Sequence, residues 1–174
     1  MGNRTWHRQE KVGGGGLAWD MRVYFLRHGE ADWPNWDRPD DERPLTERGK
    51  KEMRKVAKFL RELDIPLDEI VSSPLPRARQ TADAVADRFK LQVREQELLA
   101  GSFNVSALQE LIQRFPVENL MVVGHEPTFS EVIAELTGGH CKMSKGGVAL
   151  VELDSDDMTG RLLWLFPPKI AKVL

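Results

Sequence analysis

The residues Arg27-His28-Gly29 place a histidine, with an arginine beside it, at the end of a predicted strand. They follow directly after the apolar run Val23-Tyr24-Phe25-Leu26. A strand that ends in a glycine turn can hold an imidazole ring rigidly and exposed, and the missing side chain of Gly29 lets a ligand approach the backbone closely. One such tripeptide is a weak signal, because isolated histidines usually satisfy core or surface hydrogen bonds. Its weight comes from later segments of the chain.

Two more predicted strands end in charged or glycine-containing turns. The second strand leads into Ser72-Ser73-Pro74 and then Arg77, and the strand Leu120-Met121-Val122-Val123 leads into Gly124-His125-Glu126. In open α/β sheets, ligands bind outside the carboxyl ends of the strands. We therefore expect two arginines and two histidines to converge on one crevice. These are Arg27, Arg77, His28 and His125.

This combination of side chains suits phosphoryl chemistry. A phosphoryl group carries charge on three peripheral oxygens, and the planar fork of an arginine supplies two hydrogen-bond donors at once. A histidine can act as the nucleophile and accept the phosphoryl group covalently. We assign that role to His28 and expect His125 to be a second donor that neutralises the charge of the transferred group. Because Arg27 and Arg77 already supply positive charge, this chemistry requires no metal ion.

Each candidate also has a structural interpretation. Taken alone, Arg77 would be a solvated surface charge in the first turn of a helix, and His125 would be a turn residue. His140 beside Cys141 has no second ligand pair at zinc-like spacing, which argues against a metal site. The pair Ser72-Ser73 lacks the Gly-x-Ser-x-Gly elbow of a serine hydrolase.

The elements that position these residues alternate between strands and helices. A helix capped by Thr46 carries apolar residues at helical spacing and ends at Ile65-Pro66, and the stretch 31–44, rich in proline and acids, is expected to be a loop. This alternation predicts a three-layer α/β/α sandwich with a mainly parallel central sheet and antiparallel strands late in the chain. The predicted strands are 22–26, 69–72, 91–94, 120–123, 147–153 and 161–166, and the other helices lie around 78–89, 108–115 and 129–136.

Composition limits the classes of protein that this chain can represent. Its 174 residues are the usual length of one domain, and its net charge of -2 gives no basic excess for nucleic acid or anionic membranes. It has no apolar run long enough for a membrane helix, and its single cysteine, Cys141, fits a reducing compartment, so we expect a cytoplasmic protein. Residues 1–20, which contain four consecutive glycines, are expected to be a flexible extension, with the natural start at Met21 and one domain over 21–174.

Four ordered segments point to a known family. They are Leu26-Arg27-His28-Gly29-Glu30-Ala31, Arg43-Pro44-Leu45-Thr46-Glu47-Arg48-Gly49, Ser72-Ser73-Pro74-Leu75-Pro76-Arg77-Ala78-Arg79-Gln80-Thr81-Ala82 and Val123-Gly124-His125-Glu126-Pro127. Together they resemble the motifs of the histidine phosphatase superfamily, including its Arg-His-Gly motif, and within it the compact SixA-type phosphohistidine phosphatases. The resemblance extends over essentially residues 21–174 and implies a phosphoglycerate mutase-like fold.

The resemblance also implies roles for particular residues. His28 would be the phosphorylated nucleophile, Arg27, Arg77 and His125 would complete the phosphate pocket, and no cofactor would be needed. Many members of the family use a glutamate as the proton donor to the leaving oxygen. Glu97 lies in the corresponding region and is the candidate for this role, although the family's flanking pattern is not preserved around it.

The weak match around Glu97 bears on the substrate. An alkoxide leaving group usually needs a positioned acid, whereas the labile P–N bond of phosphohistidine breaks with less help. The chain after Met21 also leaves little room for a cap domain that would enclose a small metabolite. We therefore expect a protein phosphohistidine phosphatase whose partner is a phosphorylated protein, such as a histidine-phosphotransfer domain, with no nucleic acid or membrane involved. A small-molecule phosphomonoesterase of the same fold and a non-catalytic phosphate-binding module are the alternatives, and a mutase is disfavoured.

Overall fold

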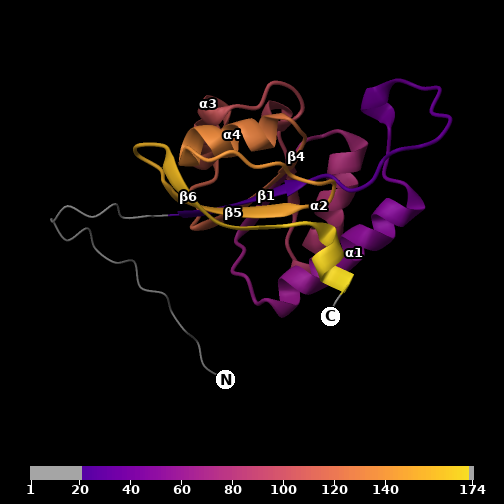
Figure 1. Ribbon diagram of the computed structural model, residues 1–174, viewed down its shortest axis with the longest axis horizontal. Helices are drawn as coiled ribbons and strands as arrows, with labels where there is room; N and C mark the ends of the chain where they lie inside the picture. Colours follow the sequence, from indigo (N-terminus) through magenta and orange to yellow (C-terminus); the bar gives the residue numbers. More distant parts are fainter. Residues whose placement is uncertain (1–20, 173–174) are drawn as a thin grey trace, which may run out of the picture.

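Four helices lie on the two faces of a six-stranded sheet in the computed structural model, which describes residues 21–172 (Figure 1). The prediction for residues 1–20 lies outside the described residues. The strands are β1 (Met21–Arg27), β2 (Glu69–Ser72), β3 (Val93–Glu95), β4 (Asn119–Gly124), β5 (Val148–Asp154) and β6 (Thr159–Phe166). The helices are α1 (Glu47–Glu62), α2 (Pro76–Phe89), α3 (Val105–Arg114) and α4 (Thr128–Thr137). Three 3-10 turns are η1 (Asp40–Glu42), η2 (Glu97–Leu99) and η3 (Pro168–Lys172).

The sheet is mixed, as predicted. Its strand order is β3-β2-β4-β1-β5-β6. The pairs β2–β3, β2–β4 and β1–β4 are parallel, whereas β5 runs antiparallel to both β1 and β6. The central strand β1 thus has a parallel neighbour on one side and an antiparallel neighbour on the other. The fold is the predicted three-layer α/β/α sandwich.

Alternating residues of β1 point into two separate cores. Tyr24 and Leu26 pack with α1 and α2 on one face of the sheet, and Val23 and Phe25 pack with α3 and α4 on the other. All four of these side chains are at most 1% exposed. A strand covered on both faces reads as a continuous apolar run, which explains the pattern of residues 23–26 in the sequence.

Helix α1 begins where the sequence places its cap. The Thr46 hydroxyl accepts a 3.0 Å hydrogen bond from the Gly49 N–H, which satisfies one of the free donors of the first turn. The helix ends at Glu62, slightly before the predicted Ile65-Pro66, because Asp64 adopts a left-handed conformation with φ of 51°. The third strand also differs from its prediction, since it covers Val93–Glu95 and not 91–94.

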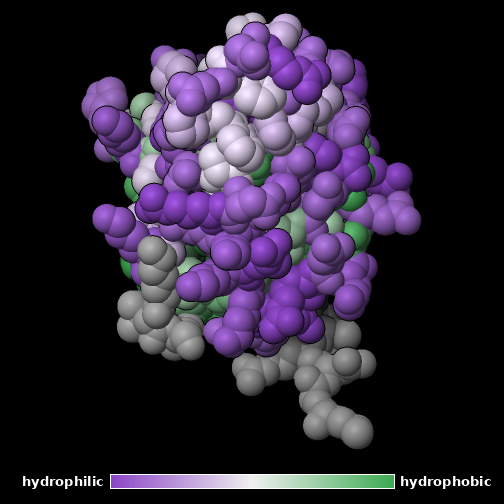
Figure 2. All heavy atoms as spheres, turned by 90° about the vertical axis from the view of Figure 1, so that its right-hand side faces the viewer, coloured by the Kyte–Doolittle hydropathy of each residue, from purple (hydrophilic) through white to green (hydrophobic). Residues whose placement is uncertain are grey.

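The outer side of α1 is solvated. The side of the molecule onto which α1 and the loop before it project is largely hydrophilic (Figure 2), as expected from the many lysines and arginines of this helix. In the described part of the chain, no helix is long and apolar enough to cross a membrane.

Candidate active site

Three parallel strands end side by side at one edge of the sheet. In the sheet register, Arg27 of β1 pairs with Gly124 of β4, and Ser72 of β2 pairs with Val123 of β4. The segments that follow these strands line a cavity of about 470 Å³. The structure therefore brings the four predicted phosphate-binding residues into the lining of one cavity. These are Arg27, His28, Arg77 and His125.

The backbone around His28 is held by hydrogen bonds from two other segments. The His28 N–H donates to the Gly124 carbonyl at 3.0 Å, and the His28 carbonyl accepts from the Gly146 N–H at 2.9 Å. The ring nitrogen Nδ1 lies 2.7 Å from the Gly29 carbonyl oxygen. Because a carbonyl only accepts, Nδ1 carries the proton and Nε2 keeps its lone pair. The fold thus presents Nε2 as the nucleophilic atom.

The His28 ring is less exposed than predicted. The residue is 8% exposed, because the ring lies in the wall of the cavity and does not project from the turn. The His125 ring lies beside it, with ring centroids 5.2 Å apart, and His125 Nε2 shares a 2.9 Å hydrogen bond with the buried Ser73 hydroxyl. Ser73 thereby fixes the second histidine, a role that the sequence did not indicate.

Burial holds both imidazole rings neutral. Burial first, and then the nearby His125, Arg77 and Arg27, lower the pKa of His28 to about 3, although the hydrogen bond to Gly29 opposes this shift. Burial, followed by the charges of Arg77 and Arg27, lowers the pKa of His125 to about 4. His28 is therefore unprotonated at neutral pH, as a nucleophile must be.

These shifted pKa values predict a pH dependence of stability. Histidines of the unfolded chain take up protons near their ordinary pKa of 6.5, whereas the pKa values of folded His28 and His125 are about 3 and about 4. The unfolded state therefore binds more protons between these limits, and the free energy of unfolding falls as the pH drops from about 6.5 to about 4. Each histidine contributes a slope of at most about 1.4 kcal/mol per pH unit.

Urea unfolding of the wild type and of His28→Asn over this pH range measures how much His28 contributes to the pH dependence of the free energy of unfolding. The variant is expected to lose stability less steeply on acidification, because it lacks one of the two buried rings. Equal slopes for the two proteins would contradict the low pKa of His28.

The two predicted arginines of the cavity are only partly bonded, and Arg77 is buried whereas Arg27 is half-buried. Arg77 is 8% exposed, so it is not the solvated surface charge of the structural interpretation. Arg27 Nη1 donates to the Met143 carbonyl at 2.7 Å, and both terminal nitrogens of Arg77 donate to Asp40. The Nε of each arginine is buried and finds no hydrogen-bond partner among residues 21–172. Unpaired buried donors are costly, and the planar guanidinium is a preferred partner of phosphate and carboxylate groups.

Gly29 has a different purpose from the one predicted. We expected its missing side chain to admit a ligand, but the space beside Gly29 is filled by the side chains of Met53 of α1 and of Leu45 just before α1. A Cβ at this position would lie 2.8 Å from Met53 Cγ and 3.3 Å from Leu45 Cδ2. The Gly29 N–H donates to the Thr81 hydroxyl at 3.0 Å, and that hydroxyl donates to the Arg77 carbonyl at 2.7 Å. The glycine thus permits close packing of α1 and links the nucleophile turn to α2.

Four charged residues of the cavity wall were not predicted. Arg43 and Lys145 add positive charge, and Asp32 and Glu126 add negative charge. Lys145 and Asp32 form an ion pair on this wall. Arg43 begins one of the four family motifs, so the sequence could have indicated that it belongs to the site. No sequence pattern indicates Lys145, because its partner Asp32 lies 113 positions away in the chain.

Glu97 does not line the cavity that contains His28. It is exposed on η2 and borders an adjoining cavity of about 610 Å³, which meets the first at Gly101. The structure thus places the candidate proton donor beside the site and not within it.

Metal-ligand geometry is not found in the part of the chain that the structure covers. Within residues 21–172, no three His, Cys, Asp or Glu side chains are grouped as metal ligands would be. His140 is exposed and Cys141 is half-buried, and they do not form part of such a group.

Comparisons with known proteins identify the family of this chain. The family model of the histidine phosphatase superfamily (branch 1) matches residues 23–101. An uncharacterized protein of Picosynechococcus is 34% identical over 138 residues, which cover 74% of this chain and 82% of that protein. The phosphohistidine phosphatase SixA of Escherichia coli is 29% identical over 164 residues, which cover 88% of this chain and 100% of SixA.

A solved structure is similar over nearly its whole length. The structure of the protein histidine phosphatase SixA complexed with tungstate has a TM-score of 0.77 and 27% identity, and the match covers 86% of this chain and 99% of that one. The sequence relatives and the fold lead to the same assignment. The chain therefore belongs to the histidine phosphatase superfamily and is SixA-like within it.

Proposed function

We propose that this chain is a phosphatase that hydrolyses phosphohistidine on another protein and holds the phosphoryl group transiently on His28. One observation carries the proposal. A neutral imidazole whose Nδ1 is engaged by a carbonyl lies in a cavity with the half-buried Arg27 and the buried Arg77, and the buried Nε atoms of both arginines lack partners in the described part of the chain. This arrangement supplies both a nucleophile and an anion-binding site, and it needs no metal ion.

The reaction proceeds in two displacements. In the first, His28 Nε2 forms a bond to phosphorus, and the P–N bond of the substrate breaks with its electron pair returning to the leaving nitrogen. The second ring nitrogen of the substrate carries the proton, so the leaving group is neutral imidazole. In the second, water attacks phosphorus, the bond to His28 breaks, and phosphate departs with the proton balance closed by solvent. Arg27 and Arg77 stabilise the charge of the transferred group, whereas His125, whose low pKa keeps it neutral, acts as a hydrogen-bond donor and not as the neutralising charge that we expected.

The carboxylates on the cavity wall favour this leaving group. Asp32 is paired with Lys145, whose hydrogen bond lowers the pKa of Asp32. Glu126 accepts hydrogen bonds from the N–H groups of Ser130 and Met143 and from the Ser130 hydroxyl. Both carboxylates are thus engaged as acceptors and are not poised to donate a proton. An alkoxide would need such a donor more than an imidazole does.

The shape of the site suits a macromolecular substrate. The cavity that holds His28 adjoins the larger cavity at Gly101, so the polypeptide around a phosphorylated side chain has room beside the reacting group. The named activity of the SixA relatives supports the same substrate class. A phosphorylated protein such as a histidine-phosphotransfer domain is therefore the proposed partner.

Phosphate release from a phosphohistidine protein, compared with a panel of phosphomonoesters, tests the proposal. We expect faster release from the phosphohistidine protein, at a rate that excess chelator leaves unchanged, because arginines supply the positive charge. Preference for a sugar or glycerate phosphate would move the assignment to a small-molecule phosphomonoesterase. Phosphate binding without turnover of any substrate would indicate a binding module, and loss of activity with chelator would refute metal independence.

A further inference from the structure

The carboxylate of Asp40 bridges two arginines of the cavity wall. Its Oδ1 lies 2.7 Å from Arg43 Nη2, and its Oδ2 accepts a 3.1 Å hydrogen bond from Arg77 Nη2. The Asp40 carbonyl accepts a further bond of 2.7 Å from Arg77 Nη1. Asp40 is the first residue of the η1 turn and Arg43 directly follows its last residue, whereas Arg77 belongs to α2. One residue of a distant turn therefore holds both terminal nitrogens of Arg77.

The bridge leaves one side of the Arg77 guanidinium free. A guanidinium has five N–H donors, and two of its edges can each bind an anion bidentately. Asp40 occupies the edge formed by Nη1 and Nη2, whereas Nε, on the other edge, has no partner within residues 21–172. The Arg77 side chain is only 9% exposed. Asp40 is thus compatible with an anion on Arg77 and does not take its place.

The bridge also offsets repulsion between the two arginines. Burial lowers the pKa of Arg77, the charge of Asp40 raises it, and the charge of Arg43 lowers it again. With its two oxygens on different guanidinium groups, the carboxylate compensates both positive charges at once. Without it, two cations on one cavity wall would tend to separate.

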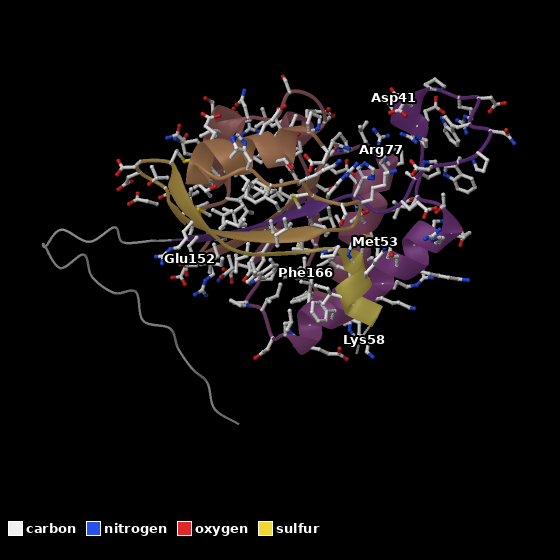
Figure 3. The ribbon with its side chains drawn as sticks, viewed as in Figure 1. Asp41, Met53, Lys58, Arg77, Glu152 and Phe166 are labelled. Carbon is white, nitrogen blue, oxygen red and sulfur yellow. The ribbon has the colours of Figure 1, made fainter. Side chains whose placement is uncertain are left out.

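The loop that carries Asp40 is braced by its own side chains. Trp33 Nε1 donates to the Pro44 carbonyl at 2.9 Å, and Trp36 Nε1 donates to the Pro39 carbonyl at 3.0 Å. Arg38 forms an ion pair with Glu42 inside the same loop. In Figure 3 the turn labelled at Asp41 stands over the labelled Arg77. The loop is a fixed support for the carboxylate, although it is formed largely of irregular backbone.

We propose that Asp40 is a positioning residue, which fixes the Arg77 guanidinium so that its Nε edge receives the phosphoryl group. This role rests on the proposed function, because it assigns the phosphoryl group to Arg77. The loop 31–44 thus helps to orient the anion site, although it lies outside the segments after the strand ends that supply the four phosphate-binding residues. A carboxylate near an anion site would repel the anion if it only added charge. Here the repulsion is outweighed by the orientation of a bidentate donor.

Asp40→Asn tests the proposal, with Asp41→Asn as the matched control. Both changes remove one negative charge near Arg77, but only Asp40 is hydrogen-bonded to Arg77, whereas Asp41 acts on it through its charge alone. Asp40 has 67% of its side chain exposed, so its replacement should leave the fold intact, and thermal unfolding checks this. We expect Asp40→Asn to lower kcat/KM on the phosphohistidine protein by about 10- to 100-fold, mainly through kcat, because a misplaced donor acts most strongly in the transition state.

Calorimetric binding of inorganic phosphate gives a second measurement that does not depend on turnover. Asp40→Asn is expected to bind phosphate several-fold more weakly than the wild type, and Asp41→Asn is expected to match the wild type or bind slightly more tightly. Equal phosphate affinity and equal kcat/KM in the two variants would overturn the positioning role. Tighter binding and faster turnover in Asp40→Asn alone would also overturn it, since Asp40 would then be a competitor of the substrate.

The two measurements separate this inference from the proposed function. If the wild type fails to hydrolyse phosphohistidine but Asp40→Asn still loses phosphate affinity relative to Asp41→Asn, the proposed function is wrong and the positioning role stands. If the wild type is active and the two variants behave alike, the positioning role alone is wrong.

Discussion

His28→Ala is expected to abolish phosphate release, with a loss of at least about 10⁴-fold, while the protein remains folded. The variant removes the atom that forms the bond to phosphorus, and no other described side chain of the cavity presents a neutral nitrogen in the same position. His140→Ala is the matched control, because His140 is exposed and does not line the cavity. The control is expected to retain wild-type activity. Circular dichroism checks that both variants are folded.

The covalent step has a direct signature. Rapid quench of the wild type with labelled substrate should trap phosphate on the protein in a form that is labile in acid and stable in base, as expected for a phosphoramidate. The label should be absent from His28→Ala. Label on a serine or an aspartate, or full activity of His28→Ala, would refute the mechanism.

Arg77→Lys is expected to lose roughly 2–4 kcal/mol of transition-state stabilisation, by analogy with removal of an oxyanion donor. Lysine keeps the charge but has one nitrogen, so it cannot bond to Asp40 and to the phosphoryl group in the geometry that the guanidinium provides. The loss should appear as a fall of about 30- to 1,000-fold in kcat/KM. Arg27→Lys is expected to behave similarly, since Met143 holds its Nη1 while its Nε lacks a partner in the described chain.

Arg79→Lys is the matched control for Arg77→Lys. Arg79 lies two residues further along α2 and pairs with Asp83 and Glu95 on the surface. Its replacement should leave kcat/KM nearly unchanged, because exposed ion pairs contribute little. Near-wild-type activity in Arg77→Lys would mean that the Nε edge does not bind the phosphoryl group.

The sequence predicts the reactive centre of the site but not its surroundings. Arg27, His28 and His125 follow apolar runs typical of buried strands, and parallel strands end at the same edge of a sheet, so their convergence follows from local patterns. Arg77 requires one more step, since it lies in the helix after β2. The convergence of these four residues could therefore be predicted from their spacing and motifs.

The other residues of the site could not be predicted from the sequence in this way. Asp40 reaches Arg77 across 37 positions of the chain and Lys145 reaches Asp32 across 113, and no periodicity records such contacts. Glu97 was assigned by its region alone, and its place on η2 turns it to the adjoining cavity. Gly29 illustrates a different limit, because a glycine signals a close approach without identifying what approaches.

The position of β1 in the middle of the sheet anchors the nucleophile to the part of the domain that opens least often. Its backbone is paired on both edges, and both of its faces are buried. Amide protons in such a strand exchange with solvent only when the whole domain opens. The nucleophile is thus attached to the slowest part of the molecule, while the loop 31–44 lies outside the sheet. The pairing and burial of β1 therefore hold the attacking nitrogen in the same place from one turnover to the next.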